Sequence, residues 1–287
     1  MKIGKPLYRV FSYLAHSIGR MRKSYYFEDY MRVYPDGLAY YPLRVRRKPT
    51  KTDLNNFTNH QKFYFFVSQF ANGKKVVDVG CGSGHGCEVL KKRGGADVYG
   101  CDLSKASIAF AKSRFGESAQ FSCQPMTDMK GYPDDFADVA ISSEVLEHIK
   151  EYGKEEQAIL EMKRITRNGG LLMIATPNSE LLGAHGFYFD EISKLFAGHF
   201  SKFCIFENAF MPFGSARAAW EQRVKENRVG VVISELINLE ESVAPEGMVP
   251  EIKQGLPPGK FSFDGIEFDT TLLHNTHSWI VLARNEK

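Results

Sequence analysis

The sequence predicts an α/β fold, with a mostly parallel seven-stranded sheet and helices on both of its faces. Short apolar runs alternate with segments of helical periodicity from residue 75 onward, and this alternation is typical of parallel sheets. The glycine-rich stretch VVDVGCGSGHG, residues 76–86, begins with the first of these runs. Parallel sheets bind ligands beyond the carboxyl ends of their strands, so this stretch marks the expected site.

The strands are expected where short runs of apolar, β-branched or aromatic residues occur. These runs are residues 75–80, 97–102, 119–123, 136–143, 171–176, 202–209 and 278–285.

Helices are expected between the strands, at residues 86–94, 104–116, 154–170 and 190–200. Ser104 is a suitable N-cap for the second of them, and glycine residues end the first three. The third helix has one apolar face, formed by Ala158, Ile159, Met162 and Ile165.

Two segments lie outside the alternating pattern. Residues 1–70 are basic and rich in Tyr and Phe, and they include an amphipathic helical pattern that we expect to dock on the core as a cap. Residues 210–277 form an insertion before the last strand. The core is therefore expected to comprise residues 71–209 and 278–287, with the insertion as a lid.

Positive charge is concentrated near the N-terminus. Residues 1–53 contain twelve Lys and Arg and four acidic residues, although the whole chain has a net charge of only +3. The densest cluster is RVRRK, residues 44–48. Such a segment suits an anionic partner such as acidic lipid, nucleic acid or a phosphorylated substrate, or else it is a solvated arm.

The cysteines, the apolar runs and the N-terminus indicate a compartment. Cys81, Cys87, Cys101, Cys123 and Cys204 are odd in number and lack paired metal-binding spacing, so we expect small buried residues in a reducing environment. No apolar run has the length of a membrane span, and no signal peptide is recognised. These features predict a cytoplasmic protein.

The glycine stretch does not fit the common nucleotide-binding patterns. Gly80, Gly82 and Gly84 give G-x-G-x-G, but the third glycine of the dinucleotide-binding fingerprint falls on His85. The G-K-[ST] sequence of a P-loop is also absent.

The stretch VVDVGCGSG resembles motif I of the class I S-adenosylmethionine-dependent methyltransferases, which have a Rossmann-like fold. The resemblance continues to Ala209, through CDLS after the second strand, DDFADVAISSEVLEHI at the fourth and RNGGLLMIATPN at the fifth. It implies S-adenosylmethionine as the cofactor. Asp78 would then lie near the cofactor's ammonium group, and Asp102 would accept both ribose hydroxyls. The cofactor-binding residues implied are Asp78, Gly80, Cys81, Gly82, Ser83, Gly84, Asp102, Leu103, Met126, Thr127, Ser143, His60 and Tyr64.

One position departs from the family pattern. Members usually carry an acidic residue after the third strand that binds the adenine amino group, and here Pro125 occupies that place. Met126 and Thr127 would contact the base instead, and Asp128 is an alternative that aligns two to three residues late.

The expected reaction is O-methylation of a small molecule or a glycan or cell-envelope acceptor. The stretch TPNSELLGAHGFYFDEISKLF is similar to methyltransferases that act on such acceptors. A hydroxyl acceptor must lose its proton, and His148 and His185 are the candidate bases, with Asp190 a further candidate. The insertion would cover the acceptor. Peripheral contact with an anionic membrane surface is the alternative to docking of the N-terminal segment on the core.

The sequence leaves open two alternative functions and a metal-binding version of the site. The first alternative is a nucleic-acid (RNA 2′-O) methyltransferase, which the basic stretch RVRRK suggests. The second is a protein of this fold that binds the cofactor without catalysis. Glu144, Glu147 and His148 have i, i+3, i+4 spacing, which places them on one helical face. This resembles the metal site of certain RNA and quinol O-methyltransferases, but we predict a metal-free site here.

Overall fold

The computed structural model describes residues 39–41, 44–47, 51–94, 97–179, 186–207, 236–238, 259–273 and 278–287. The N-terminal amphipathic helix, most of the 210–277 insertion and the candidate base His185 lie outside these residues.

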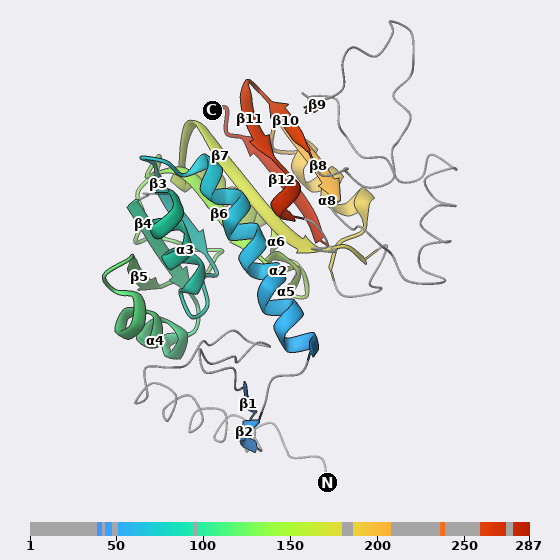
Figure 1. Ribbon diagram of the computed structural model, residues 1–287. Helices are drawn as coiled ribbons and strands as arrows, with labels where there is room; N and C mark the ends of the chain where they lie inside the picture. The colour runs from blue at the N-terminus through green and yellow to red at the C-terminus, as the bar shows by residue number, and fades with distance from the viewer. Residues whose placement is uncertain are drawn as a thin grey trace, which may run out of the picture.

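A seven-stranded sheet in the order β5-β4-β3-β6-β7-β12-β8 forms the core (Figure 1). The strands are β3 Lys75–Val79, β4 Asp97–Asp102, β5 Gln120–Cys123, β6 Ala137–Ser143, β7 Thr166–Pro177, β8 Lys202–Glu207 and β12 Ser278–Arg284. Neighbouring strands in the series β5, β4, β3, β6 and β7 pair in parallel. Strand β12 runs antiparallel to both β7 and β8. The predicted α/β fold is confirmed. The chain moves outward from β3 to β5 and then returns to β6, so the strand order reverses between β3 and β6.

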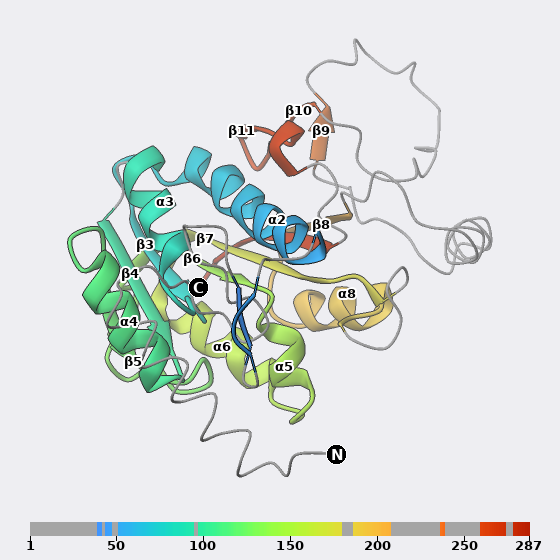
Figure 2. The same cartoon turned by 60° about the horizontal axis from the view of Figure 1, so that its bottom comes forward.

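Helices cover both faces of the sheet, as Figures 1 and 2 show. One face carries α2 Lys51–Val67, α3 His85–Gly94 and α4 Lys105–Phe115, and the other carries α5 Leu146–Lys150, α6 Glu155–Ile165 and α8 Phe189–Ala197. Residues alternate along each strand between two hydrophobic clusters: Val76 packs beneath α2 and α3, and Val77 packs against the α6 side. The N-cap prediction for α4 is confirmed, since the Ser104 hydroxyl accepts from the Ser107 N–H.

Two smaller sheets accompany the core. Strands β1 Ala39–Tyr41 and β2 Arg44–Arg47 pair with each other, and β9 Leu236–Asn238, β10 Lys260–Phe263 and β11 Ile266–Asp269 form a three-stranded sheet. A short 3-10 turn, η1 Ser68–Phe70, follows α2, and another, η2 Thr271–Leu273, follows β11.

The β10–β11 hairpin belongs to the packed core on the α2 face. The ring of Phe268 lies 5.6 Å from the ring of Phe66 on α2 and 6.5 Å from that of Phe206 on β8. At the hairpin turn, Asp264 accepts from the guanidinium of Arg284 at 2.7 Å. Arg284 is the last residue of β12, and this end of β12 lies away from the carboxyl ends of the parallel strands. The described hairpin of the 210–277 insertion therefore does not cover the glycine stretch, and the lid stays a prediction for the rest of the insertion.

The boundary between the third predicted helix and the fifth strand is wrong. We expected the helix to end at the double glycine, but α6 ends at Ile165 and β7 begins at Thr166. The glycines are part of the strand. Position 170 requires glycine because a Cβ there would lie 2.8 Å from the carbonyl oxygen of Asp138 on β6. The carbonyl of Gly170 also accepts from the N–H of Asn285, beside the end of β12.

The cysteine prediction is confirmed at four positions and wrong at the fifth. Cys81, Cys87, Cys101 and Cys204 are buried free thiols, whereas Cys123 is a free thiol that is exposed. Cys123 is the last residue of β5, which is an edge strand of the sheet.

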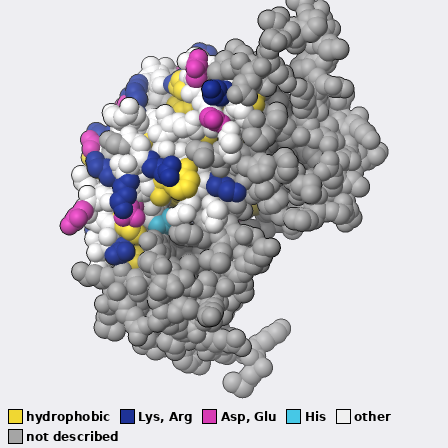
Figure 3. Space-filling view, in the orientation of Figure 1, with side chains coloured by type: hydrophobic (Ala, Val, Ile, Leu, Met, Phe, Trp, Pro, Cys, Tyr) yellow, Lys and Arg dark blue, Asp and Glu magenta, His cyan; other side chains and the backbone are white. Residues whose placement is uncertain are grey.

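Basic side chains lie on the outward surface of α3, among acidic and hydrophobic ones (Figure 3). The last turn of α3 carries Lys91, Lys92 and Arg93, which are exposed. Arg93 stacks on the ring of Phe65 with its guanidinium carbon 4.0 Å from the ring centroid. None of the described helices is long and apolar enough to cross a bilayer.

Candidate functional site

Residues 80–84 form the turn between β3 and α3, at the reversal of strand order. Gly80, Gly82 and Gly84 have φ angles of 81°, 53° and 83°, which residues with a side chain rarely adopt. Space is short as well, because a Cβ on Gly80 would lie 2.4 Å from Cγ2 of Val145. The repeated glycines are therefore required by the path of the backbone and by its closeness to the neighbouring loop.

Asp102, the last residue of β4, is fixed beside this turn by main-chain donors. Its Oδ2 accepts from the N–H of Gly82 at 3.0 Å, and its Oδ1 accepts from the N–H of Ser104 at 2.7 Å. The residue is half-buried, and each carboxylate oxygen can accept a second hydrogen bond. The carboxylate is therefore oriented so that it can accept from two neighbouring hydroxyls.

Asp78 lies beneath the turn, with 0% of its surface exposed. Its Oδ2 accepts from the Tyr64 hydroxyl at 3.1 Å and from the Cys87 thiol at 3.4 Å. Tyr64 reaches it from α2 across Gly86, where a Cβ would lie 2.0 Å from the tyrosine ring. Tyr64 and Asp78 thus support the glycine turn from within the core. The contact of Asp78 with a ligand ammonium stays a prediction.

The loop after β5 lies next to the end of β4. Leu103 is 72% exposed, whereas Met126 is buried and Thr127 is half-buried. Asp128 forms an ion pair with Lys130 at 2.9 Å. An exposed leucine directly after Asp102 provides a flat apolar surface beside the carboxylate.

A buried carboxyl group lies on the other side of the turn, at the ends of β6 and β7. Glu147 is 3% exposed, and its Oε2 accepts from the Thr176 hydroxyl at 2.9 Å. Burial first, and then the nearby carboxylate of Glu144, raise the pKa of Glu147 to about 8. Nε2 of His148 lies 3.8 Å from Oε1 of Glu147. A histidine and a protonatable glutamate are therefore side by side at the ligand-binding edge of the sheet.

Glu144, Glu147 and His148 do not share a helical face, which corrects the spacing argument. Helix α5 begins at Leu146, and Glu144 precedes it with φ of 56°. The backbone of Glu144 instead continues the sheet edge, since its N–H donates to the carbonyl of Ala175, and its Oε1 accepts from the Ser278 hydroxyl at 2.8 Å. Among the described residues, no group of three or more His, Cys, Asp or Glu side chains is placed to hold a metal ion.

The comparisons with known proteins agree with this geometry. Residues 77–174 match the family model described as a methyltransferase domain. A probable S-adenosylmethionine-dependent methyltransferase of Mycolicibacterium smegmatis is 27% identical over 133 residues, which cover 42% of this chain and 45% of that protein. Over the region that they cover, these matches support a class I S-adenosylmethionine-dependent methyltransferase domain.

Other relatives carry more specific names. A ubiquinone biosynthesis O-methyltransferase of Rhodopseudomonas palustris is 34% identical over 110 residues, covering 37% of this chain and 41% of that protein. The matched region spans less than half the length of these curated relatives. Among solved structures, the magnesium protoporphyrin IX methyltransferase of Synechocystis with bound cofactor aligns with a TM-score of 0.45 and 21% identity, over 54% of this chain and 76% of that one.

S-adenosylmethionine is the cofactor of this methyltransferase family, and the described residues fit it. The turn at Gly80–Gly84 gives close access to main-chain N–H groups at the start of α3, which suits the carboxylate of an amino-acid tail. Asp102 has the oriented oxygens that a ribose diol needs. Leu103 provides an apolar surface for the base.

The structure places the remaining predicted site residues as follows. Ser83 and Cys81 are buried in the turn, and Ser83 Oγ lies 3.4 Å from Nδ1 of His85. Ser143 ends β6 and is buried. His60 lies on α2 one turn before Tyr64 and is half-buried. Asp190 is exposed in the first turn of α8.

Sequence reasoning missed residues whose importance depends on long-range contacts. Thr176 and Ser278 hold the two glutamates from strands far away in the chain. On α6, only the apolar face is recognised from the sequence, although Gln157, Glu161 and Arg164 have the i, i+4, i+7 spacing of a shared polar face. That spacing is the signal available for finding them.

Proposed function

We propose that this chain transfers the methyl group of S-adenosylmethionine to a hydroxyl oxygen of a small molecule or of a glycan or cell-envelope acceptor. The observation that carries the proposal is the pair of His148 and Glu147, which lies across the glycine turn from Asp102 at the carboxyl edge of the sheet. Asp102 and the glycine turn would hold the cofactor, and His148 and Glu147 would serve the acceptor at the same edge of the sheet. The ubiquinone O-methyltransferases among the relatives support an oxygen acceptor.

The chain's residues have separate tasks in this reaction. The cofactor supplies a methyl group on a sulfonium centre, and the enzyme positions the acceptor in line with it and excludes water. The acceptor hydroxyl loses its proton as the new C–O bond forms, and the His148 imidazole takes that proton. Glu147, 3.8 Å away, stabilises the resulting imidazolium.

The pair differs from a surface histidine and glutamate in its environment. Because Glu147 is buried, its carboxyl prefers to stay protonated, as its raised pKa shows. When His148 gains a proton, the nearby positive charge favours ionisation of Glu147. A protonated His148 and the Glu147 carboxyl are thus close enough for the carboxyl to act as the counter-charge of the imidazolium.

The free thiols support a cytoplasmic location for the enzyme. All five cysteines are free, and the buried thiols at Cys81 and Cys87 lie in contact without being joined. A reducing compartment is consistent with this arrangement.

The proposal is tested with methyl-labelled S-adenosylmethionine and a mixture of catechols, quinols and monosaccharides. We expect label in an O-methyl product, loss of at least about 100-fold in kcat for His148→Ala, and activity retained in EDTA. The matched control is His199→Ala, since His199 pairs with Glu156 on the far side of α6. Cofactor binding without any labelled product would favour the non-catalytic alternative, and activity restored only by Mg²⁺ or Mn²⁺ would favour a metal site.

A further inference from the structure

Three polar residues on one face of α6 hold the main chain of the loop that follows β5. Gln157, Glu161 and Arg164 have i, i+4, i+7 spacing, so their side chains leave the helix on the same side. Gln157 Nε2 donates to the carbonyl of Thr127 at 3.0 Å. Oε2 of Glu161 accepts from the N–H of Met129 at 2.9 Å.

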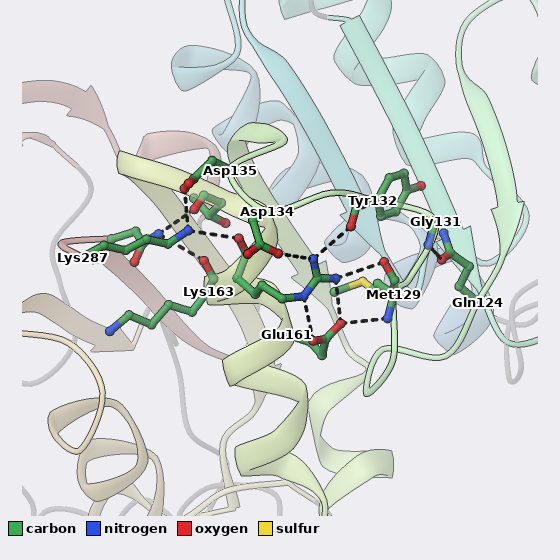
Figure 4. Close-up of polar contacts among 12 residues, drawn as sticks. Gln124, Met129, Gly131, Tyr132, Asp134, Asp135, Glu161, Lys163 and Lys287 are labelled. Carbon is green, nitrogen blue, oxygen red and sulfur yellow. Dashed lines mark hydrogen bonds and ion pairs between the residues drawn. The ribbon is translucent and has the colours of Figure 1, made fainter.

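Arg164 uses all five of its N–H donors in this network (Figure 4). Nε and one Nη2 donor reach the two oxygens of Glu161, at 2.9 and 3.0 Å. The other Nη2 donor binds the carbonyl of Met129 at 3.1 Å, and Nη1 binds the carbonyl of Tyr132 at 3.0 Å and the carboxylate of Asp134 at 2.8 Å. A planar guanidinium with this many partners fixes the loop in position and in orientation.

The same loop is also tied to the cofactor side of the sheet. The Cys101 thiol donates to Sδ of Met129 at 3.7 Å, one residue before Asp102. The side-chain oxygen of Gln124 accepts from the N–H of Gly131 at 2.6 Å and closes the loop on itself (Figure 4). The loop is thus held from α6 on one side and from the ends of β4 and β5 on the other.

This loop lacks the side chain that commonly recognises the adenine amino group. Pro125 occupies that place, and its ring carries neither a donor nor an acceptor. The carboxylate of Asp128 is paired with Lys130. Main-chain groups and the hydroxyl around Thr127 would then be the partners of the base, and their directions depend on contacts such as that of Gln157 with the Thr127 carbonyl.

We propose that Gln157, Glu161 and Arg164 are positioning residues that set the base specificity of the cofactor site by fixing the main chain of residues 125–132. The inference concerns binding of the cofactor and does not depend on which acceptor is methylated. A residue that acts through the loop should change discrimination between bases, whereas a purely structural residue should change affinity for all cofactors equally.

The test measures dissociation constants by calorimetry for S-adenosylhomocysteine and for S-inosylhomocysteine, which carries a carbonyl in place of the amino group. Arg164→Lys keeps the charge and loses the planar fork, and Gln157→Leu removes the donor to Thr127 from an exposed position. The matched controls are Arg167→Lys and Glu156→Gln, whose side chains pair with Asp138 and His199 away from the loop. Thermal unfolding of every variant identifies any that do not fold, and Gln157→Leu keeps the test decisive if Arg164→Lys is among them.

We expect the wild type to prefer the adenosyl compound by at least about tenfold, and both variants to lose most of that preference while the controls keep it. Weaker binding of both compounds with an unchanged ratio would overturn the proposal, as would unchanged binding in Gln157→Leu. Because no methyl transfer is measured, failure of the proposed O-methylation leaves this result intact.

Discussion

The Tyr64 hydroxyl donates a hydrogen bond of 3.1 Å to Oδ2 of Asp78, joining helix α2 to strand β3 of the sheet. Both residues are buried, and Asp78 precedes the glycine turn by two positions. The contact matters because a buried carboxylate needs hydrogen bonds to replace the water that it has lost. Helix α2 thus supports the strand end from which the glycine turn begins.

Tyr64→Phe tests that contact. The variant keeps the ring and removes one of the hydrogen bonds to Asp78, so we expect the free energy of unfolding to fall by about 1–3 kcal/mol. Urea unfolding followed by circular dichroism measures it. Tyr152→Phe is the matched control because Tyr152 is 77% exposed, and equal stability of the two variants would show that the contact contributes nothing.

Gly86→Ala tests the space beneath the tyrosine. A Cβ at this position would lie 2.0 Å from the Tyr64 ring, which is fixed between Asp78 and His85. The ring must move, and we expect destabilisation of about 1–3 kcal/mol, the usual range for overpacking. Gly198→Ala is the control, since the new Cβ would meet Lys194 O at an ordinary 3.5 Å. Combining Gly86→Ala with Tyr64→Leu should recover part of the loss, and strict additivity would contradict the explanation.

The fold and the cofactor side of the site could be predicted because their signals are local in sequence. Strand and helix alternation and the glycines of residues 80–84 depend on neighbours a few residues apart. The end of α6 could not be placed, because Gly170 is required by the carbonyl of Asp138 on β6 rather than by a helix cap.

On the acceptor side, too, the residues could be found from local sequence but their environment could not. His148 and Glu147 are found from the motif, yet their environment depends on Thr176, 29 residues away, and Glu144 is held by Ser278, 134 residues away. The raised pKa of Glu147 is a property of that assembled environment. The spacing of Glu144 and Glu147 indicated one helical face, but the backbone at Glu144 turns with positive φ instead.

Asp102→Asn tests the ribose assignment. The amide replaces one acceptor oxygen by a donor, which would face the N–H of Gly82 or of Ser104 or a ribose hydroxyl. We expect the dissociation constant for S-adenosylhomocysteine to rise at least about tenfold in calorimetry, the loss of one or two charged hydrogen bonds. Asp97→Asn, at the exposed start of the same strand, should leave it unchanged. Unaltered affinity in Asp102→Asn would remove the assignment.

Glu147→Gln tests the buried carboxyl through the pH dependence of stability. Below its ordinary pKa of 4.5, Glu147 is protonated in both the folded and the unfolded chain. Between pH 4.5 and about 8 the unfolded chain is ionised while the folded chain keeps the proton, so stability falls as pH rises through this window. The stability contributed by the protonated carboxyl is therefore fully present below pH 4.5 and lost above about pH 8.

Glutamine keeps an oxygen for the Thr176 hydroxyl and does not ionise. Relative to the wild type, Glu147→Gln should therefore gain stability with rising pH, by up to about 1.4 kcal/mol for each pH unit within the window. Urea unfolding at pH 5, 6, 7 and 8 measures the difference between the two proteins, in which shared pH effects cancel. Glu117→Gln, on the exposed turn after α4, should give no slope. A flat difference for Glu147→Gln would show that its carboxyl is ionised in the folded protein.

Cysteine alkylation tests the part of the proposed cofactor site that would hold the adenine base. Burial raises the pKa of the Cys87 thiol to about 11 and also raises the pKa of Cys81 and Cys101, so these thiols are protonated and covered at pH 8. Cys123 is exposed, and its thiol donates to the carbonyl of Leu103 at 3.5 Å. Iodoacetamide should therefore modify Cys123 first in the native protein, as followed by intact mass and peptide mapping.

The same alkylation shows whether the adenine base of a bound cofactor covers Leu103. A cofactor seated on Leu103 would shield the neighbouring Cys123 thiol, so saturating S-adenosylhomocysteine should slow its alkylation by at least about threefold, a lower limit for a thiol whose access is restricted. Cys123→Ser should abolish the fast phase while leaving the slow labelling of the four buried thiols as it is. Fast labelling of Cys81 or Cys87 would contradict the buried turn, because the reagent would then reach beneath the glycines. Labelling of Cys123 that is indifferent to S-adenosylhomocysteine would place the adenine base elsewhere, since the Cys123 thiol lies against the Leu103 carbonyl.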